Sequence, residues 1–347
     1  MKQYKSLDLA KFICAILIII LHTAPFSNYS KALTFGFRNI VTVIAVPFFF
    51  LTSGFLAFKK IDSFEAKEKK KYVFGYLKRL AVMYMAWSAL YFVFVLIKWT
   101  RNDFSIYSVL EYIKDFFFEG SYSTIWFLPA LFTATLFVYF SHKKFSYKVI
   151  FVIACVIYFF TLCGSSYYGL TSKVPFIALV YDIYYSFFDS IKNGVCFGMI
   201  FVCMGAMMAE KEDELTNNSS AGIAFVPVLM FAVLLAIEEF LIAYFNWNIR
   251  GVDTVISLVP FTYFFFKFVL LFEINIKDNI CLAMRKYSIL MFLSQRIPLS
   301  IIELFMKDTI VATNSFLHFV TVLFATLLIS FLIIQCSKKY KILKYIY

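Results

Sequence analysis

The chain has 347 residues, of which 62% are hydrophobic, and it carries a formal net charge of +12 at pH 7. Soluble domains average about 45–50% apolar residues, so the composition excludes an ordinary soluble enzyme. Apolar runs of about eighteen residues or more recur from end to end, which predicts an all-α polytopic membrane protein. In such a protein positive charge indicates cytoplasmic loops and anionic lipid headgroups rather than a nucleic-acid partner.

We expect about ten transmembrane helices around a polar central cavity, in one domain that covers residues 1–347. The expected spans are 8–24, 40–58, 78–98, 125–141, 148–163, 190–209, 221–245, 252–272, 286–305 and 313–336. No segment has the composition of an appended soluble catalytic domain. The first apolar stretch follows a basic start, but no small-residue cleavage site follows His22, which favours an uncleaved first span.

The basic residues of the connections predict the orientation. They gather at the N-terminus and in every second connection: Lys2, Lys5; Lys59, Lys60, Lys67, Lys69, Lys70, Lys71, Lys78, Arg79; Lys143, Lys144, Lys148; Lys277, Arg285, Lys286; and Lys338, Lys339, Lys341, Lys344. The other connections contain few. The positive-inside rule therefore predicts an even number of spans with both termini in the cytoplasm.

Two ionisable side chains stand out in the first span. Lys11 and His22 are eleven positions apart, close to three helical turns, so they point to nearly one face and lie roughly 16 Å apart along the axis. Ionisable groups at membrane depth usually face a protein interior and mark function. Taken singly, Lys11 also fits a snorkelling lysine and His22 an interfacial helix end. Their shared face favours a functional pair.

The second span contains a proline and a small-residue pair. Pro47 inside a span would free backbone groups, and Ser53-Gly54 would allow a neighbouring helix to approach closely. The sixth span repeats the small-residue signal with Gly194, Gly198 and Gly205, which predicts close packing. In the connection after the third span, apolar residues at helical spacing over 104–118 predict an amphipathic helix in the outer interface.

Later spans add further charged residues. Glu238 and Glu239 lie near the outer side of the seventh span, where a buried acid, an ion pair with Arg250 or an interfacial position all fit. Arg296 lies in mid-span within Ser294-Gln295-Arg296-Ile297-Pro298, which favours a shared polar interior. An ion pair of Arg296 with Glu303, or with one of the two earlier glutamates, is the structural alternative.

Metal chemistry is not expected. The seven cysteines lie mostly in apolar runs without a C-x-x-C pair, and the chain has three histidines: His22, His142 and His318. No cluster has zinc-ligand spacing, and the motifs of nucleotide-binding loops, serine hydrolases and zinc proteases are missing from the sequence.

Several motifs together resemble the integral-membrane acyltransferase family 3. The family has a basic residue, ten residues and a histidine in its first span, matched here by Lys11 and His22, where lysine replaces the family's arginine. The other matching motifs are Val46-Pro47-Phe48-Phe49 through Ser53-Gly54-Phe55-Leu56, Tyr76-Leu77-Lys78-Arg79-Leu80 and Trp126-Phe127-Leu128-Pro129-Ala130-Leu131. His22-Thr23-Ala24-Pro25, with residues 84–88, is similar to the membrane half of vancomycin-resistance serine racemases of the same family. Two further positions differ: Val82 and Arg296 stand where the family usually has arginine and histidine.

The resemblance implies O-acyl transfer, commonly acetyl, from cytoplasmic acetyl-CoA or another acyl-CoA to a hydroxyl of an extracytoplasmic glycan or other cell-envelope acceptor. His22 is then expected to be the general base or a transient acyl carrier. Lys11, Lys78 and Arg79 are expected to meet the CoA phosphates, and Arg296 the thioester oxygen or oxyanion. A cell-membrane location follows. The alternative is a non-catalytic transporter or sensor of a small amino acid such as serine.

Overall fold

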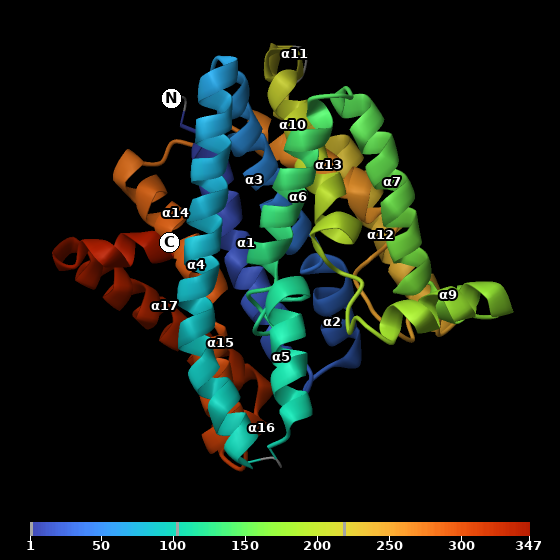
Figure 1. The fold of residues 1–347 in the computed structure, drawn as a ribbon, viewed down its shortest axis with the longest axis vertical. Helices are drawn as coiled ribbons and strands as arrows, with labels where there is room; N and C mark the ends of the chain where they lie inside the picture. The colour runs from blue at the N-terminus through green and yellow to red at the C-terminus, as the bar shows by residue number, and fades with distance from the viewer. Residues whose placement is uncertain (1–2, 102–103, 218–219) are drawn as a thin grey trace. The chain divides into compact units, whose positions relative to one another are not determined.

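The computed structural model of the chain describes residues 3–101, 104–217 and 220–347 (Figure 1). Over these ranges the chain is helical, with turns and short connections and no β-strand. Lys2, which the orientation argument counts, lies outside the described residues. The chain divides into two compact units, one of residues 1–45, 78–129 and 274–347 and the other of residues 46–77 and 130–273.

The first unit is built from both ends of the chain and one central segment. Its helices are α1 (Lys5–Thr23), α2 (Lys31–Phe35), the π-helical turn η1 (Gly36–Val41), most of α4 (Ala66–Arg101), α5 (Ile106–Phe118), α14 (Asp278–Ser294), α15 (Arg296–Phe305), α16 (Ile310–Thr313), α17 (Ser315–Lys339) and the 3₁₀ helix η3 (Lys341–Ile346). The core of this unit forms where α1 packs against α14 and α17.

The second unit contains the middle of the chain. Its helices are α3 (Ala45–Asp62), the start of α4, most of α6 (Phe127–His142), α7 (Tyr147–Gly164), α8 (Tyr168–Thr171), α9 (Pro175–Tyr185), η2 (Gly194–Gly198), α10 (Met199–Glu210), α11 (Glu212–Asn217), α12 (Ala221–Tyr244) and α13 (Leu258–Leu271). Phenylalanine rings fill its core, where Phe48 and Phe55 of α3 both contact Phe266 of α13.

Each of the ten predicted spans overlaps an apolar helix. Seven helical segments of the described chain are long and apolar enough to cross a membrane: Lys5–Thr23, Lys31–Asp62, Lys67–Arg101, Tyr147–Gly164, Ala221–Tyr244, Asp278–Phe305 and Ser315–Lys339. The other three predicted spans fall on shorter apolar helices, Phe127–His142, Gly194–Glu210 and Leu258–Leu271. The structure thus supports a multi-pass helical membrane protein.

Helix directions within the first unit follow from side-chain pairs. Lys5 contacts Asp278 and, further along both helices, Asp8 contacts Arg285, so α1 and α14 run parallel. Ser315 at the start of α17 bonds to Pro25 just after α1, so those two helices run antiparallel. These directions are the ones that a chain crossing a membrane alternately would give to its first, ninth and tenth spans.

The second unit obeys the same alternation. Phe50 and Gly54 of α3 lie against Gly198 and Val202, respectively, so α3 runs parallel to the η2–α10 segment. Thr161 of α7 instead bonds to Cys196, while Tyr147 at the start of α7 contacts Cys203, which makes α7 antiparallel to that segment. In a chain that crosses a membrane alternately, the second span (α3) should run parallel to the sixth (η2–α10), and the fifth span (α7) antiparallel to it. Both directions are observed.

Pro47 does not interrupt a continuous helix. The chain turns at residues 42–44, between η1 and α3, so Pro47 lies in the first turn of α3. The first N–H groups of a helix have no acceptor within it, so a proline there frees no further backbone group. The expectation that Pro47 frees backbone groups inside the second span is wrong for this reason.

The predicted close packing of the small residues is confirmed. A side-chain carbon added at Gly54 would lie 2.5 Å from the main-chain oxygen of Val202 on α10. One added at Gly205 would lie 2.6 Å from the main-chain nitrogen of Phe55 on α3. Both obstacles are backbone atoms, which cannot rotate away as a side chain can. These glycines therefore let α3 and α10 approach backbone to backbone.

Gly205→Ala is expected to lower the free energy of unfolding by about 1–3 kcal/mol, because the added methyl group forces α3 and α10 apart. Denaturant unfolding of the purified protein in detergent micelles measures the effect. The matched control is Gly75→Ala in α4, where no atom lies within 4 Å of the new carbon. There the gain in helix propensity should raise stability slightly. Equal effects of the two substitutions would contradict the close-packing argument.

The predicted amphipathic helix exists as α5, and its apolar residues are exposed. Ile106, Leu110 and Phe117 are 80%, 61% and 68% exposed. On its other side α5 lies along the second half of α4, where Tyr112 contacts Phe92 and Phe116 contacts Tyr84. An exposed stripe of this kind suits a helix lying at a membrane interface.

Glu238 and Arg250 do not pair. Glu238 accepts hydrogen bonds from the main-chain N–H groups of Ile256 (2.6 Å) and Ser257 (2.8 Å) and from the hydroxyl of Tyr167. Burial and this contact with the Glu238 carboxylate raise the pKa of Tyr167 above its usual range. Arg250 pairs instead with Asp182 of α9 at 3.0 Å. Of the three alternatives, the Arg250 ion pair is wrong for Glu238, because its carboxylate anchors the connection that leads into α13. The buried acid is confirmed, since Glu239 is 1% exposed.

Candidate functional site

All five residues nominated from the sequence belong to the first unit. Lys11 and His22 lie on α1, Lys78 and Arg79 on α4, and Arg296 begins α15. Their environments differ: Lys11 is buried, Arg296 is partly buried, and His22 is exposed in the last turn of α1. Directly after α1, Ala24 takes a left-handed backbone conformation with φ of 44°. That conformation is unfavourable for a residue with a side chain, so His22 precedes a strained turn.

Lys11 is part of a buried ion-pair network. Its ammonium lies 3.0 Å from the carboxylate of Asp8, one helical turn earlier on α1. The same carboxylate accepts two hydrogen bonds from Arg285 of α14, at 3.0 and 2.7 Å. Asp8 is 2% exposed, so one buried anion stands between two cations from two helices. This network ties α1 to α14 and holds the ammonium of Lys11 in one place.

Arg296 stands at a break between two helices. The helix that starts at Asp278 stops at Ser294, and α15 restarts at Arg296. Pro298 causes the break, because it has no N–H to give to the oxygen of Ser294, four residues earlier. Next to this position, the hydroxyl of Tyr91 on α4 donates a 2.5 Å hydrogen bond to the main-chain oxygen of Leu293. Gln295 at the junction keeps a right-handed helical conformation, and its N–H still bonds to the oxygen of Met291 at 3.1 Å, so the helix is interrupted without being unwound.

Tyr122 forms the centre of a polar cluster beside the break. Gly120, with φ of +99°, makes the tight turn after α5 that brings Tyr122 against α4. The ring of Tyr122 stacks on that of Tyr91, with centroids 4.8 Å apart and planes 4° from parallel. Its hydroxyl lies 2.8 Å from that of Ser300 on α15.

Two cations flank this ring. The ammonium of Lys98 on α4 lies 5.2 Å from the Tyr122 centroid, and the guanidinium of Arg296 lies 5.9 Å from it. Arg296 also pairs with Glu303 at 2.8 Å, which is the structural alternative that the sequence left open. We call Lys98, Tyr122, Arg296, Ser300 and Glu303 the Tyr122 cluster.

His22 lies at the depth of this cluster. Since α1 and α14 run parallel, the Lys5–Asp278 and Asp8–Arg285 pairs set their register. Both helices rise by about 1.5 Å per residue, so His22 is level with residues 295–299, at the helix break. The Tyr91–Leu293 bond places Tyr91, in the last third of α4, near this level too. His22 and Arg296 therefore share one level, and Lys11 lies about 16 Å along α1 from it.

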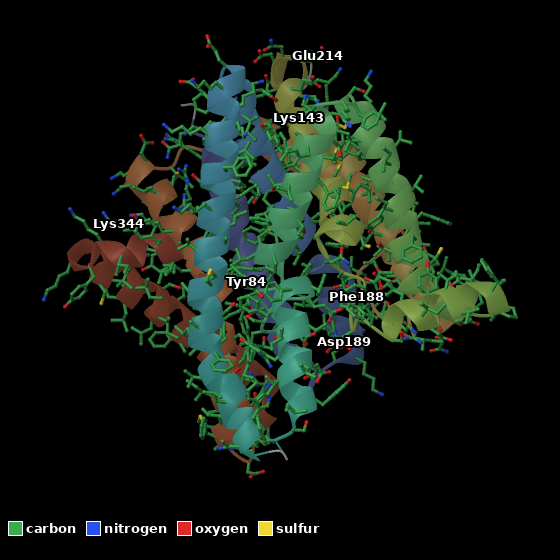
Figure 2. The ribbon with its side chains drawn as sticks, viewed as in Figure 1. Tyr84, Lys143, Phe188, Asp189, Glu214 and Lys344 are labelled. Atoms are coloured by element: carbon green, nitrogen blue, oxygen red, sulfur yellow. The ribbon has the colours of Figure 1, made fainter. Side chains whose placement is uncertain are left out.

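Lys78 and Arg79 lie at the opposite end of the first unit. Counting back along α4 and α14 from the Tyr91–Leu293 bond places Lys78 and Arg79 level with the start of α14. The Lys5–Asp278 pair lies at that same level. Arg79 donates a 2.9 Å hydrogen bond to the main-chain oxygen of Tyr347, and Trp87 donates one of 3.0 Å to that of Ile346. The end of the segment 341–347 thus lies against α4 beside Arg79 and Trp87. Figure 2 shows Lys344 on the outer edge of this segment, pointing away from α4.

A second polar network joins α4 to α5 and the turn after it. The hydroxyl of Tyr84 donates to the main-chain oxygen of Phe116 (2.6 Å) and accepts from the N–H of Ser121 (2.8 Å). The hydroxyl of Ser121 in turn donates to that of Ser88 (2.6 Å). Figure 2 shows Tyr84 midway along α4, beside the end of α5. This network holds the turn that carries Tyr122.

Sequence reasoning missed Asp8, Arg285, Tyr91, Lys98 and Tyr122. Asp8 carried a usable signal, because it is an acid one helical turn before Lys11. Arg285 was counted only as a charge that indicates orientation. Lys98 and the tyrosines gave no local signal, since their roles depend on contacts with distant parts of the chain.

An all-helical, multi-pass membrane protein with ionisable groups held between its helices narrows the candidate families. The family profile described as "Acyltransferase domain", that of acyltransferase family 3, matches residues 4–335. The chain belongs to this family, and the match includes residues of both compact units. Membership supports a membrane acyltransferase in general terms. No solved structure matches the chain.

The curated relatives are named as racemases and not as acyltransferases. The chain is 27% identical to a protein called "Amino-acid racemase" from Enterococcus faecalis over 96% of its own length and 45% of that protein's. It is 24% identical to a "Serine/alanine racemase" from Enterococcus gallinarum, over 75% of this chain and 36% of the relative. The chain thus spans less than half the length of the curated relatives it matches.

Proposed function

We propose that the protein is a membrane O-acyltransferase that moves an acyl group, commonly acetyl, from cytoplasmic acyl-CoA to a hydroxyl of an extracytoplasmic cell-envelope acceptor. The family match over residues 4–335 carries this proposal. In it, both termini are cytoplasmic, the ten apolar helices all cross the cell membrane, and the helix break lies toward the outer side. The alternating helix directions within each unit support that path.

The first unit offers two chemically distinct ends for such a reaction. Lys78 and Arg79 supply positive charge for the phosphates of CoA at one end. At the other end His22 lies level with the partly buried guanidinium of Arg296. Lys11, fixed by Asp8, lies between them on α1 and supplies positive charge part-way along the path of the acyl group.

Acyl transfer to an alcohol requires a group that takes the hydroxyl proton as the new ester bond forms. The imidazole of His22 takes this proton near neutral pH while the thioester C–S bond breaks and the thiolate of CoA leaves. In a two-step variant, the His22 nitrogen itself accepts the acyl group and then passes it to the hydroxyl. Arg296 stabilises the negative oxygen that develops on the acyl carbon in either case.

Acetyl-CoA binding and hydrolysis by the purified protein test the proposal. We expect the wild type to bind acetyl-CoA and hydrolyse it slowly without an acceptor. The double variant Lys78→Gln/Arg79→Gln should bind it at least tenfold more weakly, because each phosphate contact with a charged group contributes about 1.5–3 kcal/mol. Lys143→Gln/Lys144→Gln, which removes two charges elsewhere, is the matched control. A folded wild type that binds no acyl-CoA would overturn the proposal.

Residues 341–347 should compete with the donor, because Arg79 already bonds to the main-chain oxygen of Tyr347. Deleting these residues is expected to raise acetyl-CoA affinity about twofold to tenfold, the worth of one hydrogen bond. Trp87→Phe, which removes the bond to Ile346, should raise it by less. Isothermal titration measures both. Lower affinity after the deletion would show that the segment helps to bind the donor.

A non-catalytic transporter or sensor of a small amino acid is the second candidate. The departures from the family pattern at Lys11, Val82 and Arg296 favour it, because they replace residues that the catalytic members of the family usually have. Uptake of labelled serine by proteoliposomes, without acyl-CoA turnover, would support this candidate over acyl transfer.

A further inference from the structure

We propose that the Tyr122 cluster binds an anionic group, a carboxylate or a phosphate, on the molecule that receives the acyl group. This inference rests on the proposed acyltransferase function and adds the chemical class of the acceptor. Its basis is the balance of charge around Tyr122 and the position of the cluster relative to His22.

The cluster has more positive than negative charge. Lys98 and Arg296 both lie within 6 Å of the centroid of the Tyr122 ring, and Glu303 is the carboxylate that pairs with Arg296. Among the described residues, no carboxylate lies within ion-pair distance of Lys98. Among the residues that the structure describes, Lys98 therefore has no acidic partner, and it lies in a helix of membrane-spanning length. Such a charge usually marks a ligand or ion site.

Snorkelling is the structural alternative for Lys98, which lies near the end of α4. Two observations argue against it. The ammonium of Lys98 lies 5.2 Å from the centroid of the Tyr122 ring, which is 8% exposed, and Lys98 itself is partly buried. Next along α4, Arg101 contacts the ring of Phe305 and the main-chain oxygen of Leu304, so a second cation adds to the positive field at this end.

Unused hydrogen-bonding groups also gather at the break. The side-chain oxygens of Ser294 and Gln295, both fully buried, and the Nε–H of Arg296 have no hydrogen-bond partner among the described residues. Unpaired buried polar atoms are costly, so they usually indicate a bound polar molecule or water. The arrangement supplies a guanidinium donor and an ammonium for an anion, with acceptors close to them for a hydroxyl or amine.

The position of the cluster defines what it can orient. His22 is level with residues 295–299, so an acceptor held through its anion at Lys98 and Arg296 has its hydroxyl at the depth of the imidazole. A small molecule or chain unit with a hydroxyl near a carboxylate or phosphate fits this placement. A neutral polyol lacks the group that the surplus charge binds.

Binding of glycerate, glycerol 3-phosphate and glycerol to the purified protein tests the proposal by isothermal titration. We expect both anions to bind and glycerol to bind at least tenfold more weakly. Lys98→Gln should weaken anion binding at least tenfold, and Lys98→Arg should retain most of it. Lys307→Gln, which removes an exposed lysine in the connection after α15, is the matched control and should bind as wild type.

The outcomes distinguish a carboxylate acceptor from a phosphate acceptor, and they test the anion site separately from the acyltransferase function. A preference for glycerate identifies a carboxylate acceptor and a preference for glycerol 3-phosphate a phosphate acceptor. Equal binding of glycerol and the anions, or equal losses in Lys98→Gln and Lys307→Gln, would overturn the proposal. Acetyl-CoA titration of the same samples tests the proposed function separately from the proposed anion site. If the protein binds anions but not acetyl-CoA, the acyltransferase proposal is wrong and the anion-site proposal stands.

Discussion

His22→Ala is expected to reduce acyl transfer by at least a hundredfold while leaving acetyl-CoA affinity unchanged. A positioned base contributes about 10²–10⁴ to the rate, and alanine can neither take a proton nor carry an acyl group. His22 is exposed, so its loss should change the free energy of unfolding little. Turnover is measured as CoA release in the presence of acceptor, and folding by thermal unfolding of the same preparations.

His142→Ala provides the matched histidine control. Its ring stacks on Tyr147 in the second unit at a centroid distance of 3.7 Å, so we expect some loss of stability but no loss of turnover. Rapid quenching with labelled acetyl-CoA separates the two roles of His22, because a transient acyl-imidazole would leave label on the wild-type protein. Full turnover by a folded His22→Ala protein would rule out both roles.

Hydropathy patterning was sufficient to predict the apolar helices, and the relative directions of the helix pairs described within each unit agree with alternating spans. Each predicted span overlaps an apolar helix because membrane insertion is read over windows of about twenty residues, which average out local irregularity. The glycines of α3 and α10 were predictable for a similar reason, since small residues in apolar helices mark close packing.

The side-chain partners were predictable only when both lay close together in sequence. Arg296 and Glu303 are seven positions apart, two turns of helix, and they pair as the structural alternative had it. Arg250 lies close to Glu238 along the chain, yet it pairs with Asp182, because the turn before α13 uses the Glu238 carboxylate to bind backbone N–H groups. Lys98 and Tyr122 meet only because Gly120 reverses the chain after α5. Contacts of this kind depend on tertiary packing that a single sequence does not reveal.

Asp8→Asn should destabilise the protein by about 3–5 kcal/mol. The carboxylate of Asp8 is 2% exposed and neutralises both Lys11 and Arg285, so asparagine leaves two cations facing each other without a counter-ion. Arg285 can turn toward solvent, but Lys11 is 8% exposed and its ammonium remains buried. Removing one partner of a buried charge network typically costs this much. Denaturant unfolding in micelles measures the loss.

Asp278→Asn is the matched control, because Asp278 also joins α14 to α1, through Lys5 at 2.7 Å, but its side chain is 74% exposed. An exposed ion pair contributes at most about 1 kcal/mol, so this substitution should change stability little. The double variant Asp8→Asn/Lys11→Met removes the buried cation along with its partner and should recover most of the lost stability. Equal, small effects of Asp8→Asn and Asp278→Asn would mean that the Lys11 ammonium finds water, and the network would then neither fix Lys11 nor join α1 to α14.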